Sequence, residues 1–336
     1  MRRTLGYITG AVTAAILLAG CGKTYPVGAV APTPTPVVPS VTSTYTIPTS
    51  ASDPIGITSS ASAIWFTEEA GNKIGFLDQT AKFHEVTLPN PGSEPYGITF
   101  GTDGNIWFTE YAGNKIGRYD PATSNFAEFI IPTASSDPTS IVIGPGDSAL
   151  WFTESATDKV GRVTLSGTIN EFTVGGSTPL EATSVGNDGG IWFTLNGSNQ
   201  IGEIVPITDA ITLYNVPTAG SQPYGITYGT DHAIWFTENA AGKLGRVTTN
   251  SGTFSEVTLT GCPNPGPIQQ GLDGNFYIFC LPPGSPSILQ YNPQDGHMRN
   301  FSLKSGSAPE AAILAFDRKI YFTDSGLNAI RQFTYE

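Results

Sequence analysis

The chain has 336 residues, of which 28 are Asp or Glu and 16 are Lys or Arg, so its formal net charge at pH 7 is −12. This acidic balance disfavours nucleic acid and anionic lipid surfaces as partners. Only three histidines occur in the chain, which limits where a histidine base could act.

The N-terminal segment resembles a bacterial lipoprotein signal. Arg2 and Arg3 precede an apolar run over residues 5–19, and Leu-Ala-Gly-Cys at residues 18–21 resembles a lipobox. The resemblance implies a signal peptide over residues 1–20, cleavage before Cys21 and membrane attachment through lipid on the Cys21 thiol. The alternative is an uncleaved membrane anchor, because the apolar run is near the lower length for a span. Either interpretation predicts an extracytoplasmic protein, in the periplasm or at the cell surface.

Residues 21–42 are expected to form a tether. Five prolines stand among small residues between positions 26 and 42, without any charged side chain. This composition favours an extended, semi-rigid spacer. The spacer would hold the following domain, residues 43–336, away from the membrane.

The rest of the chain repeats a motif centred on tryptophan. The motif is Ile/Leu-Trp-Phe-Thr; it contains all five tryptophans, and tyrosine takes the Trp position in two further copies. The seven positions lie 41 to 44 residues apart: Trp65, Trp107, Trp151, Trp192, Trp235, Tyr277 and Tyr321. Repetition with this period indicates units whose apolar faces are buried by their neighbours.

One copy, residues 95–132, contains four short apolar runs separated by turn residues. The runs predict strands at 96–100, 105–110, 115–119 and 126–131, and Asp103-Gly104 predicts a hairpin turn. Apolar and polar residues do not alternate in the Trp-containing run, which is typical of a strand covered on both faces. Seven such units predict an all-β fold, a seven-bladed β-propeller with four antiparallel strands per blade.

The two ends of the repeat region are incomplete in a complementary way. The last copy ends with its third strand at residues 331–336, whereas residues 44–48 resemble a fourth strand. We therefore expect the N-terminal strand to complete the last blade, because closure removes the exposed edges of an open array. We expect a single-domain monomer.

Two cysteines follow Cys21, and both fall in the sixth repeat. Cys262 lies in the loop that enters the blade, and Cys280 ends its second strand. A propeller places these two positions on one face, and an oxidising compartment favours a disulfide between them. A metal-binding pair and two free thiols are the alternatives.

Several of the Trp-Phe-Thr motifs end in glutamate: Glu68, Glu110, Glu154 and Glu238. A ring of carboxylates could bind a metal ion. Recurrence in most blades favours an architectural role instead, for example Glu110 pairing with Lys115 across the next turn. We expect no metal site.

Ligand binding is expected at the mouth of the central channel, on the loop face where the repeats differ. The residues that follow the strand-entry proline and the glutamate position converge there. Five of them would give aromatic walls with a few polar groups: Tyr96, Tyr111, Tyr224, Asn239 and Glu310. Such a surface suits a small molecule, a glycan or a protein partner. The alternative is that these residues only cover the end of the channel.

Three phrases of the repeat, at residues 95–99, 103–110 and 114–118, closely resemble the repeats of the virginiamycin B lyase family, also called the streptogramin B lyase family. The resemblance covers essentially all of residues 43–336 and implies a seven-bladed propeller. It also implies an elimination reaction that opens a cyclic depsipeptide ester, with a histidine base and a magnesium ion near the channel mouth.

The positions at which the family resemblance places catalytic residues are substituted here. The two histidines would fall at Gly266 and Glu310, and the two glutamates at Ala308 and Ser325. We also find no Ser-His-Asp set, no Gly-rich phosphate loop and no metal-ligand spacing.

No histidine of this chain is expected near the mouth. His84 and His297 begin outer strands, and His232 lies in a turn on the opposite face. We therefore expect a non-catalytic binding protein without a cofactor. The competing hypothesis is a carbon–oxygen lyase or lactone hydrolase with a relocated acid/base pair, Glu310 and Tyr224, which would need magnesium if it follows the family.

Overall fold

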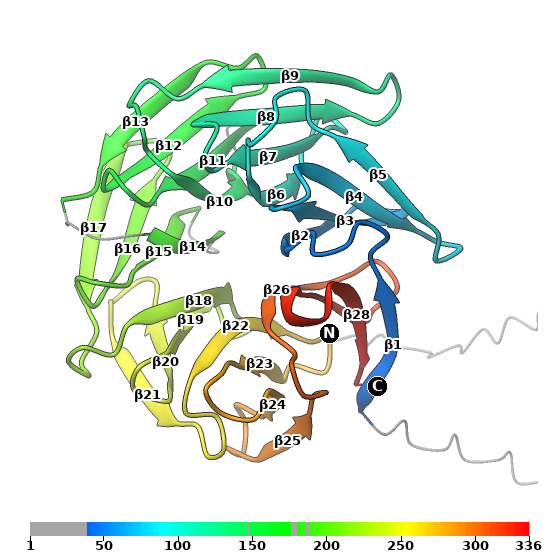
Figure 1. Ribbon diagram of the computed structural model, residues 1–336. Coiled ribbons are helices and arrows are strands. Elements are labelled where there is room, and N and C mark those ends of the chain that lie inside the picture. Colours follow the sequence, from blue (N-terminus) through cyan, green and yellow to red (C-terminus); the bar gives the residue numbers. More distant parts are fainter. Residues whose placement is uncertain (1–38, 147, 176–179, 186–188, 336) are drawn as a thin grey trace, which may run out of the picture. The chain divides into compact units, whose positions relative to one another are not determined.

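The computed structural model describes residues 39–335 except 147, 176–179 and 186–188; of residues 180–185 it describes the backbone alone. The strands form seven four-stranded antiparallel sheets, which follow one another around a ring (Figure 1). The predicted seven-bladed propeller is confirmed. The predicted signal peptide, Cys21 and the tether up to residue 38 lie outside the described residues. Within the described residues, no helix has the length and apolar character needed to cross a membrane.

In blades 1 to 4 the strands follow chain order from the centre of the ring outward (Figure 1). Blade 1 consists of β2 (Pro54–Ser59), β3 (Ala63–Glu68), β4 (Lys73–Asp78) and β5 (Phe83–Thr87). Blade 2 consists of β6 (Pro95–Phe100), β7 (Ile106–Glu110), β8 (Lys115–Asp120) and β9 (Asn125–Ile130). Blade 3 consists of β10 (Pro138–Ile143), β11 (Ala149–Glu154), β12 (Lys159–Thr164) and β13 (Ile169–Thr173). Blade 4 consists of β14 (Leu180–Val185), β15 (Ile191–Leu195), β16 (Gln200–Val205) and β17 (Ala210–Asn215).

Blades 5 and 6 keep this order, and blade 7 takes its outer strand from the other end of the domain. Blade 5 consists of β18 (Pro223–Tyr228), β19 (Ala233–Glu238), β20 (Lys243–Thr248) and β21 (Phe254–Thr258). Blade 6 consists of β22 (Pro265–Gln270), β23 (Phe276–Cys280), β24 (Ser287–Tyr291) and β25 (Met298–Ser302). Blade 7 consists of β26 (Pro309–Leu314), β27 (Ile320–Asp324), a 3-10 turn η1 (Ser325–Leu327), β28 (Ala329–Thr334) and β1 (Ser40–Thr46).

The ring is closed by strand pairing between its two ends. β1 runs antiparallel to β28, with Tyr45 opposite Ile330 and Thr46 opposite Ala329. The predicted completion of the last blade by the N-terminal strand is confirmed. This strand begins at Ser40, inside the predicted tether.

The hydrophobic core lies between neighbouring blades. The ring of Trp65 in β3 contacts Phe76 of its own blade and Tyr119 of the next, with centroids 4.3 and 6.1 Å apart. Fully burying one large apolar side chain contributes roughly 1.5–3 kcal/mol. The second strand of a blade carries large apolar side chains on both faces, and every residue of β3 and β7 is buried.

Aspartate side chains organise the turns between first and second strands. The Asp103 carboxylate accepts hydrogen bonds from the Asn105 amide and from Trp107 Nε1, both at 3.1 Å. Gly104 has φ +79°, a conformation that glycine adopts without strain. The predicted turn at residues 103–104 is confirmed, and its aspartate also fixes the indole of the motif.

The predicted ion pair between Glu110 and Lys115 is wrong. The two residues are opposite each other in the strand register, but Lys115 Nζ binds Glu128 of the fourth strand at 2.7 Å. Glu110 is fully buried, and neither of its carboxylate oxygens has a hydrogen-bond partner. The same third-to-fourth-strand ion pair recurs in three other blades: Lys73–Glu85, Lys159–Glu171 and Lys243–Glu256.

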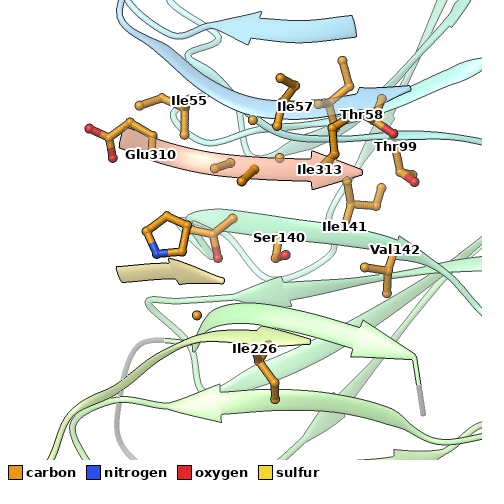
Figure 2. Close-up of a pocket in the computed structure, with 18 of the residues that line it drawn as sticks. Ile55, Ile57, Thr58, Thr99, Ser140, Ile141, Val142, Ile226, Glu310 and Ile313 are labelled. Carbon is orange, nitrogen blue, oxygen red and sulfur yellow. The ribbon is translucent and has the colours of Figure 1, made fainter. Parts of the chain in front are cut away.

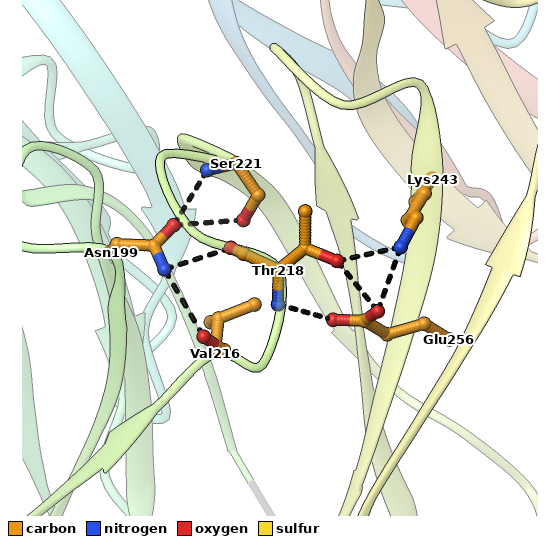
Figure 3. Close-up of polar contacts among 6 residues, drawn as sticks. All are labelled: Asn199, Val216, Thr218, Ser221, Lys243 and Glu256. Carbon is orange, nitrogen blue, oxygen red and sulfur yellow. Dashed lines mark hydrogen bonds and ion pairs between the residues drawn. The ribbon is translucent and has the colours of Figure 1, made fainter.

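The loop between blades 4 and 5 is held from both sides (Figure 3). Asn199 Oδ1 accepts hydrogen bonds from the Ser221 amide and hydroxyl at 2.7 and 2.9 Å. On the other side, the Thr218 amide and hydroxyl donate to Glu256 at 3.0 and 2.7 Å. Lys243 Nζ donates to the Thr218 hydroxyl and to the Glu256 carboxylate. These bonds fix the chain directly before β18, at the mouth of the ring.

Candidate functional site

The first strands of the blades surround a cavity of about 390 Å³ at the centre of the ring. Its described wall is built mainly from Ile, Thr and Gly, and Glu310 is the only charged side chain among the wall residues. Figure 2 shows Glu310 at the end of the cavity where β26 begins, with Ile313 further along the strand. We call the end at which the first strands begin the channel mouth.

Glycines allow the first strands to lie close together around the cavity. A Cβ atom on Gly97 would lie 2.2 Å from the carbonyl oxygen of Thr139, and one on Gly225 would lie 2.6 Å from that of Gly266. Contacts this short do not occur for real side chains, so any other residue would push adjacent blades apart. The glycine of the Pro-Tyr-Gly-Ile phrase is therefore required by close approach of the next blade.

The threonine of the Trp-Phe-Thr motif positions the mouth. Its hydroxyl donates to the backbone carbonyl of the residue that follows the strand-entry proline in the next blade. The described examples are Thr67 to Tyr96 (2.7 Å), Thr109 to Thr139 (2.7 Å), Thr194 to Tyr224 (3.1 Å), Thr237 to Gly266 (2.8 Å) and Thr323 to Ile55 (2.7 Å). Two of the residues predicted to bind ligand, Tyr96 and Tyr224, thus have their backbone carbonyls bound by the preceding blade.

Four of the five predicted ligand-binding residues lie at or beside the cavity. Tyr96, Tyr224 and Glu310 belong to its wall. The ring of Tyr111 lies next to that of Tyr96, with centroids 5.8 Å apart and planes inclined by 33°. Asn239 is not among the wall residues; its side chain donates to the carbonyl oxygen of Pro265 at 3.1 Å and so joins two blades.

Glu310 is held in a partly buried position at the mouth. The Ser325 hydroxyl donates to its Oε1 at 2.6 Å. Burial raises the pKa of Glu310 above its ordinary value, the Ser325 hydrogen bond opposes that rise, and the charges of Asp53 and Asp324 add to it. The carboxyl group can therefore exchange a proton nearer to neutrality than an exposed glutamate.

The structure adds acidic residues that the sequence analysis did not select. Asp53, Glu94 and Asp137 each directly precede a first strand, and all three have positive φ, at 53°, 52° and 48°. Glu69 follows β3, and its amide donates to the carbonyl oxygen of Asp53 at 3.0 Å. The positions before the strand-entry prolines could have revealed this group in the sequence, because three of them are acidic.

These acidic groups influence one another. The pKa of Glu69 is raised by burial first, and then by the negative charges of Asp53, Glu94 and Glu310. The pKa of the Tyr111 hydroxyl is raised by burial and by the neighbouring Asp137 carboxylate. The side of the mouth formed by blades 7, 1, 2 and 3 is therefore strongly negative.

The opposite side of the mouth carries neutral amides. Gln222 and Asn264 occupy the corresponding places in blades 5 and 6, where their backbone carbonyls accept from Asn239 and Leu281 at 3.1 and 2.9 Å. Over the described blades of the mouth the charge is thus one-sided.

The positions assigned to catalysis by the family resemblance form no acid/base set of the family's type. A Cβ atom on Gly266 would lie 2.5 Å from Leu281 Cδ1, so a larger residue there requires Leu281 to move. The Ala308 amide donates to Asp324 Oδ1 at 2.9 Å. Glu310 and Ser325 bind each other. Gly266 and Glu310 therefore stand where the family resemblance requires histidines, and Ala308 and Ser325 stand where it requires glutamates.

Magnesium, which the family resemblance implies, does not fit these residues. Among the described side chains, no three from His, Cys, Asp and Glu come close enough together to hold one ion. One carboxylate oxygen of Glu310 accepts a hydrogen bond from Ser325. These four positions therefore do not form a magnesium site of the family's type.

The histidines lie away from the cavity wall, as predicted. His84, in the outer strand β5, binds Asp78 at 2.9 Å. His232, in the turn between β18 and β19, binds the Tyr228 hydroxyl at 2.8 Å. His297 directly precedes the outer strand β25.

The predicted disulfide is present. Cys262 and Cys280 are bonded, with a Cα–Cα distance of 5.3 Å, and both residues are buried. The bond joins the entry loop of blade 6 to the end of its second strand, where four other blades carry a buried glutamate.

The sequence and the fold were compared with those of known proteins. The sequence profile of the virginiamycin B lyase family matches residues 40–280. No curated protein sequence matches the chain. A solved streptogramin B lyase structure has a TM-score of 0.82 at 30% identity and covers 88% of this chain and 97% of its own.

Two further solved structures come from Staphylococcus aureus. Selenomethionine-substituted virginiamycin B lyase has a TM-score of 0.81 at 30% identity, covering 88% of this chain and 99% of its own. A catalytically inactive histidine-to-alanine variant of that enzyme with quinupristin has a TM-score of 0.82 at 29% identity, with the same coverage.

Proposed function

The chain belongs to the virginiamycin B lyase family, and we propose that it is an extracytoplasmic, lipid-anchored member that binds a ligand at its channel mouth without opening streptogramin B rings. The ligand is a small molecule, a glycan or a segment of a protein. The observation that carries the proposal is the composition of the mouth: its described wall residues include two tyrosines and one carboxylate, and no histidine.

The absence of catalysis is supported by the assigned positions. The Staphylococcus aureus relative is catalytically inactive after replacement of a single histidine by alanine. Here Gly266 and Glu310 occupy both positions that the family resemblance assigns to histidine. Loss of a general base typically costs ~10²–10⁴-fold in rate.

The extracytoplasmic location is supported by the sequence and by the disulfide. The lipobox-like segment ends at Cys21. The Cys262–Cys280 bond is of a kind that persists in oxidising compartments. The mature chain would be held by lipid on Cys21 at the periplasmic or outer surface of a membrane.

One observation favours a second candidate, a carbon–oxygen lyase or lactone hydrolase with relocated chemistry. Glu310 is partly buried with a raised pKa, and it shares the cavity wall with Tyr224. A carboxyl group in such a setting can serve as a general acid or base. This candidate requires turnover that depends on Glu310.

The two candidates are separated by incubating the full chain, solubilised in dodecyl maltoside, with quinupristin and magnesium. We expect no ring opening above the uncatalysed background by mass spectrometry. A parallel thermal-shift screen of small molecules and oligosaccharides should give ligands that lose their effect in a Tyr96→Ala/Tyr224→Ala variant. Ring opening that Glu310→Ala abolishes would favour the enzyme. Ligand shifts unchanged by the tyrosine substitutions would contradict binding at the mouth.

A further inference from the structure

We infer that the ligand of the channel mouth carries an organic cation of the ammonium type, received between the Tyr96–Tyr111 ring pair and the carboxylates on one side of the cavity entrance. This inference rests on the proposed binding function and names the chemical class that the mouth selects. We call these carboxylates the acidic sector; its members are Asp53, Glu69, Glu94, Asp137 and Glu310.

The acidic sector is contiguous and follows the cavity rim over four successive blades. Blade 7 contributes Glu310, at the start of β26 and in the cavity wall. Blade 1 contributes Asp53 and Glu69, which are joined by a backbone hydrogen bond of 3.0 Å. Blades 2 and 3 contribute Glu94 and Asp137, which directly precede β6 and β10.

No basic side chain of the described chain neutralises the acidic sector. The third-strand lysines of blades 1, 2 and 3 are held elsewhere, by the fourth-strand glutamates: Lys73 by Glu85, Lys115 by Glu128 and Lys159 by Glu171. No Lys or Arg in the described residues forms an ion pair with a member of the sector. The charges that act on Glu69 come from other carboxylates alone.

The tyrosine pair supplies the second element of cation recognition. Tyr96 lies in the cavity wall, and Tyr111 stands beside it with ring centroids 5.8 Å apart. A cation within about 6 Å of an aromatic centroid is attracted by the negative face of the ring. The Asp137 carboxylate lies next to the Tyr111 hydroxyl, so the ring pair borders the acidic sector directly.

The geometry favours an organic cation over a metal ion. A divalent metal needs several oxygen ligands around one point, and no three acidic, His or Cys side chains of the described residues converge in this way. A bulky ammonium group instead spreads its charge over several ångströms and gains from aromatic surface. The cavity of about 390 Å³ has the size of a small-ligand site.

The amide side of the mouth gives the ligand a direction. Gln222, Asn239 and Asn264 are neutral, so among the blades whose first-strand side chains are described the electrostatic attraction lies over blades 7, 1, 2 and 3. We expect the cationic end of the ligand there and a neutral, hydrogen-bonding part toward blades 5 and 6. The formal net charge of −12 also raises the local concentration of cations.

The test uses choline and its neutral isostere 3,3-dimethylbutan-1-ol, with magnesium chloride as the metal comparison, on the full chain in dodecyl maltoside. Binding is measured by calorimetry and by ligand-observed NMR. We expect choline to bind at least about tenfold more tightly than the neutral isostere, as cation–π and charge-assisted contacts require. Raising sodium chloride from 20 to 500 mM should weaken choline binding.

The double variant Glu69→Gln/Glu310→Gln should lose about tenfold in choline affinity, and Tyr111→Leu should also weaken it. The matched control is Asp209→Asn, which removes one exposed carboxylate from the turn between β16 and β17, at the strand ends opposite the mouth. This control should bind choline normally, and circular dichroism should show that all variants fold.

Two results overturn the inference but leave the proposed binding function intact. The first is equal affinity for choline and its neutral isostere. The second is no choline binding while the screen still finds ligands that depend on Tyr96 and Tyr224. Choline binding unaffected by the double variant overturns the inference as well, because it places the cation elsewhere. Tighter binding of magnesium than of choline would assign the acidic sector to a metal ion. Failure of every probe and of the screen would contradict the binding function itself.

Discussion

The hydroxyl of Ser325 donates a 2.6 Å hydrogen bond to Glu310 Oε1, and the two residues occupy two of the four positions that the family resemblance assigns to catalysis. The pair links the end of β27 to the start of β26 within blade 7. A hydrogen bond to a carboxylate favours its ionised form, whereas burial favours the neutral form. The protonation state of the mouth therefore depends on this contact.

The first prediction concerns this pair. Ser325→Ala should raise the pKa of Glu310 further, because it removes a bond that lowers it while burial and the neighbouring acids remain. Carbon-13 NMR titration of labelled glutamate side chains measures the shift. Ser325→Thr, which keeps the hydroxyl, should leave the pKa near that of the unmodified protein. An unchanged pKa in Ser325→Ala would show that the bond has no electrostatic effect.

The second prediction concerns restoration of the family's residues. Gly266→His alone should destabilise the chain by about 1–3 kcal/mol, because the new side chain overlaps Leu281. Adding Leu281→Ala should recover part of that loss in denaturant unfolding. Only the variant that also carries Ala308→Glu, Glu310→His and Ser325→Glu should open quinupristin detectably. Opening of quinupristin by the unmodified chain would show that the four family residues are not needed for this reaction.

Closure of the ring provides the third prediction. Deleting residues 43–49 removes most of β1, which exposes the edge of β28. It also removes the hydrogen bonds of Asn328 to the carbonyl oxygens of Ile47 and Thr49. We expect a lower melting temperature and a broader transition in calorimetry. A deletion of residues 26–36, which leaves β1 intact, is the control and should melt like the full chain. A sharp, unshifted transition in the first deletion would mean that β1 is dispensable.

The fourth prediction concerns the disulfide. Cys262 and Cys280 are 18 residues apart, and closing a loop of about this length stabilises a protein by roughly 3 kcal/mol. Reduction should therefore lower the melting temperature, and a Cys262→Ser/Cys280→Ser variant should melt like the reduced protein under both conditions. If reduction changed the melting of that variant equally, the effect would not come from this bond.

The fifth prediction is a loss of stability as pH rises from about 5 to 8. Burial raises the pKa of Glu68 and Glu154 to about 8 and of Glu238 to about 7, from an ordinary 4.5. Between these values the folded chain binds more protons than the unfolded chain, so each pH unit costs up to ~1.4 kcal/mol per carboxyl group. Thermal melts at pH 5 to 9 should show a falling midpoint.

A variant with glutamine at these three positions is the control for that effect. Glutamine keeps the size of the side chain but has no proton to lose, so the dependence on pH should flatten. Fourth-strand carboxylates such as Glu256, whose pKa is lowered, remain ionised throughout this range and do not contribute. A midpoint that rises with pH would contradict the assignment of neutral buried glutamates.

The sequence by itself determined the blade count, the strand pattern, the closure and the disulfide partners. These features depend on local periodicity. The position of Trp107 recurs seven times, with tryptophan in five copies and tyrosine in two, and the last copy lacks a strand that residues near Tyr45 supply. Every repeat buries the same face against its neighbours, so one unit defines the ring.

Only the tertiary structure decided which side chains meet across blades. Lys115 binds Glu128 rather than Glu110. Burial raises the pKa of the Glu110 carboxyl group, which favours its neutral form. The acidic sector likewise combines blades 7, 1, 2 and 3, which the sequence separates by more than 150 residues between Asp137 and Glu310. Contacts of this kind depend on ring closure and on differences between repeats, which no periodic pattern encodes.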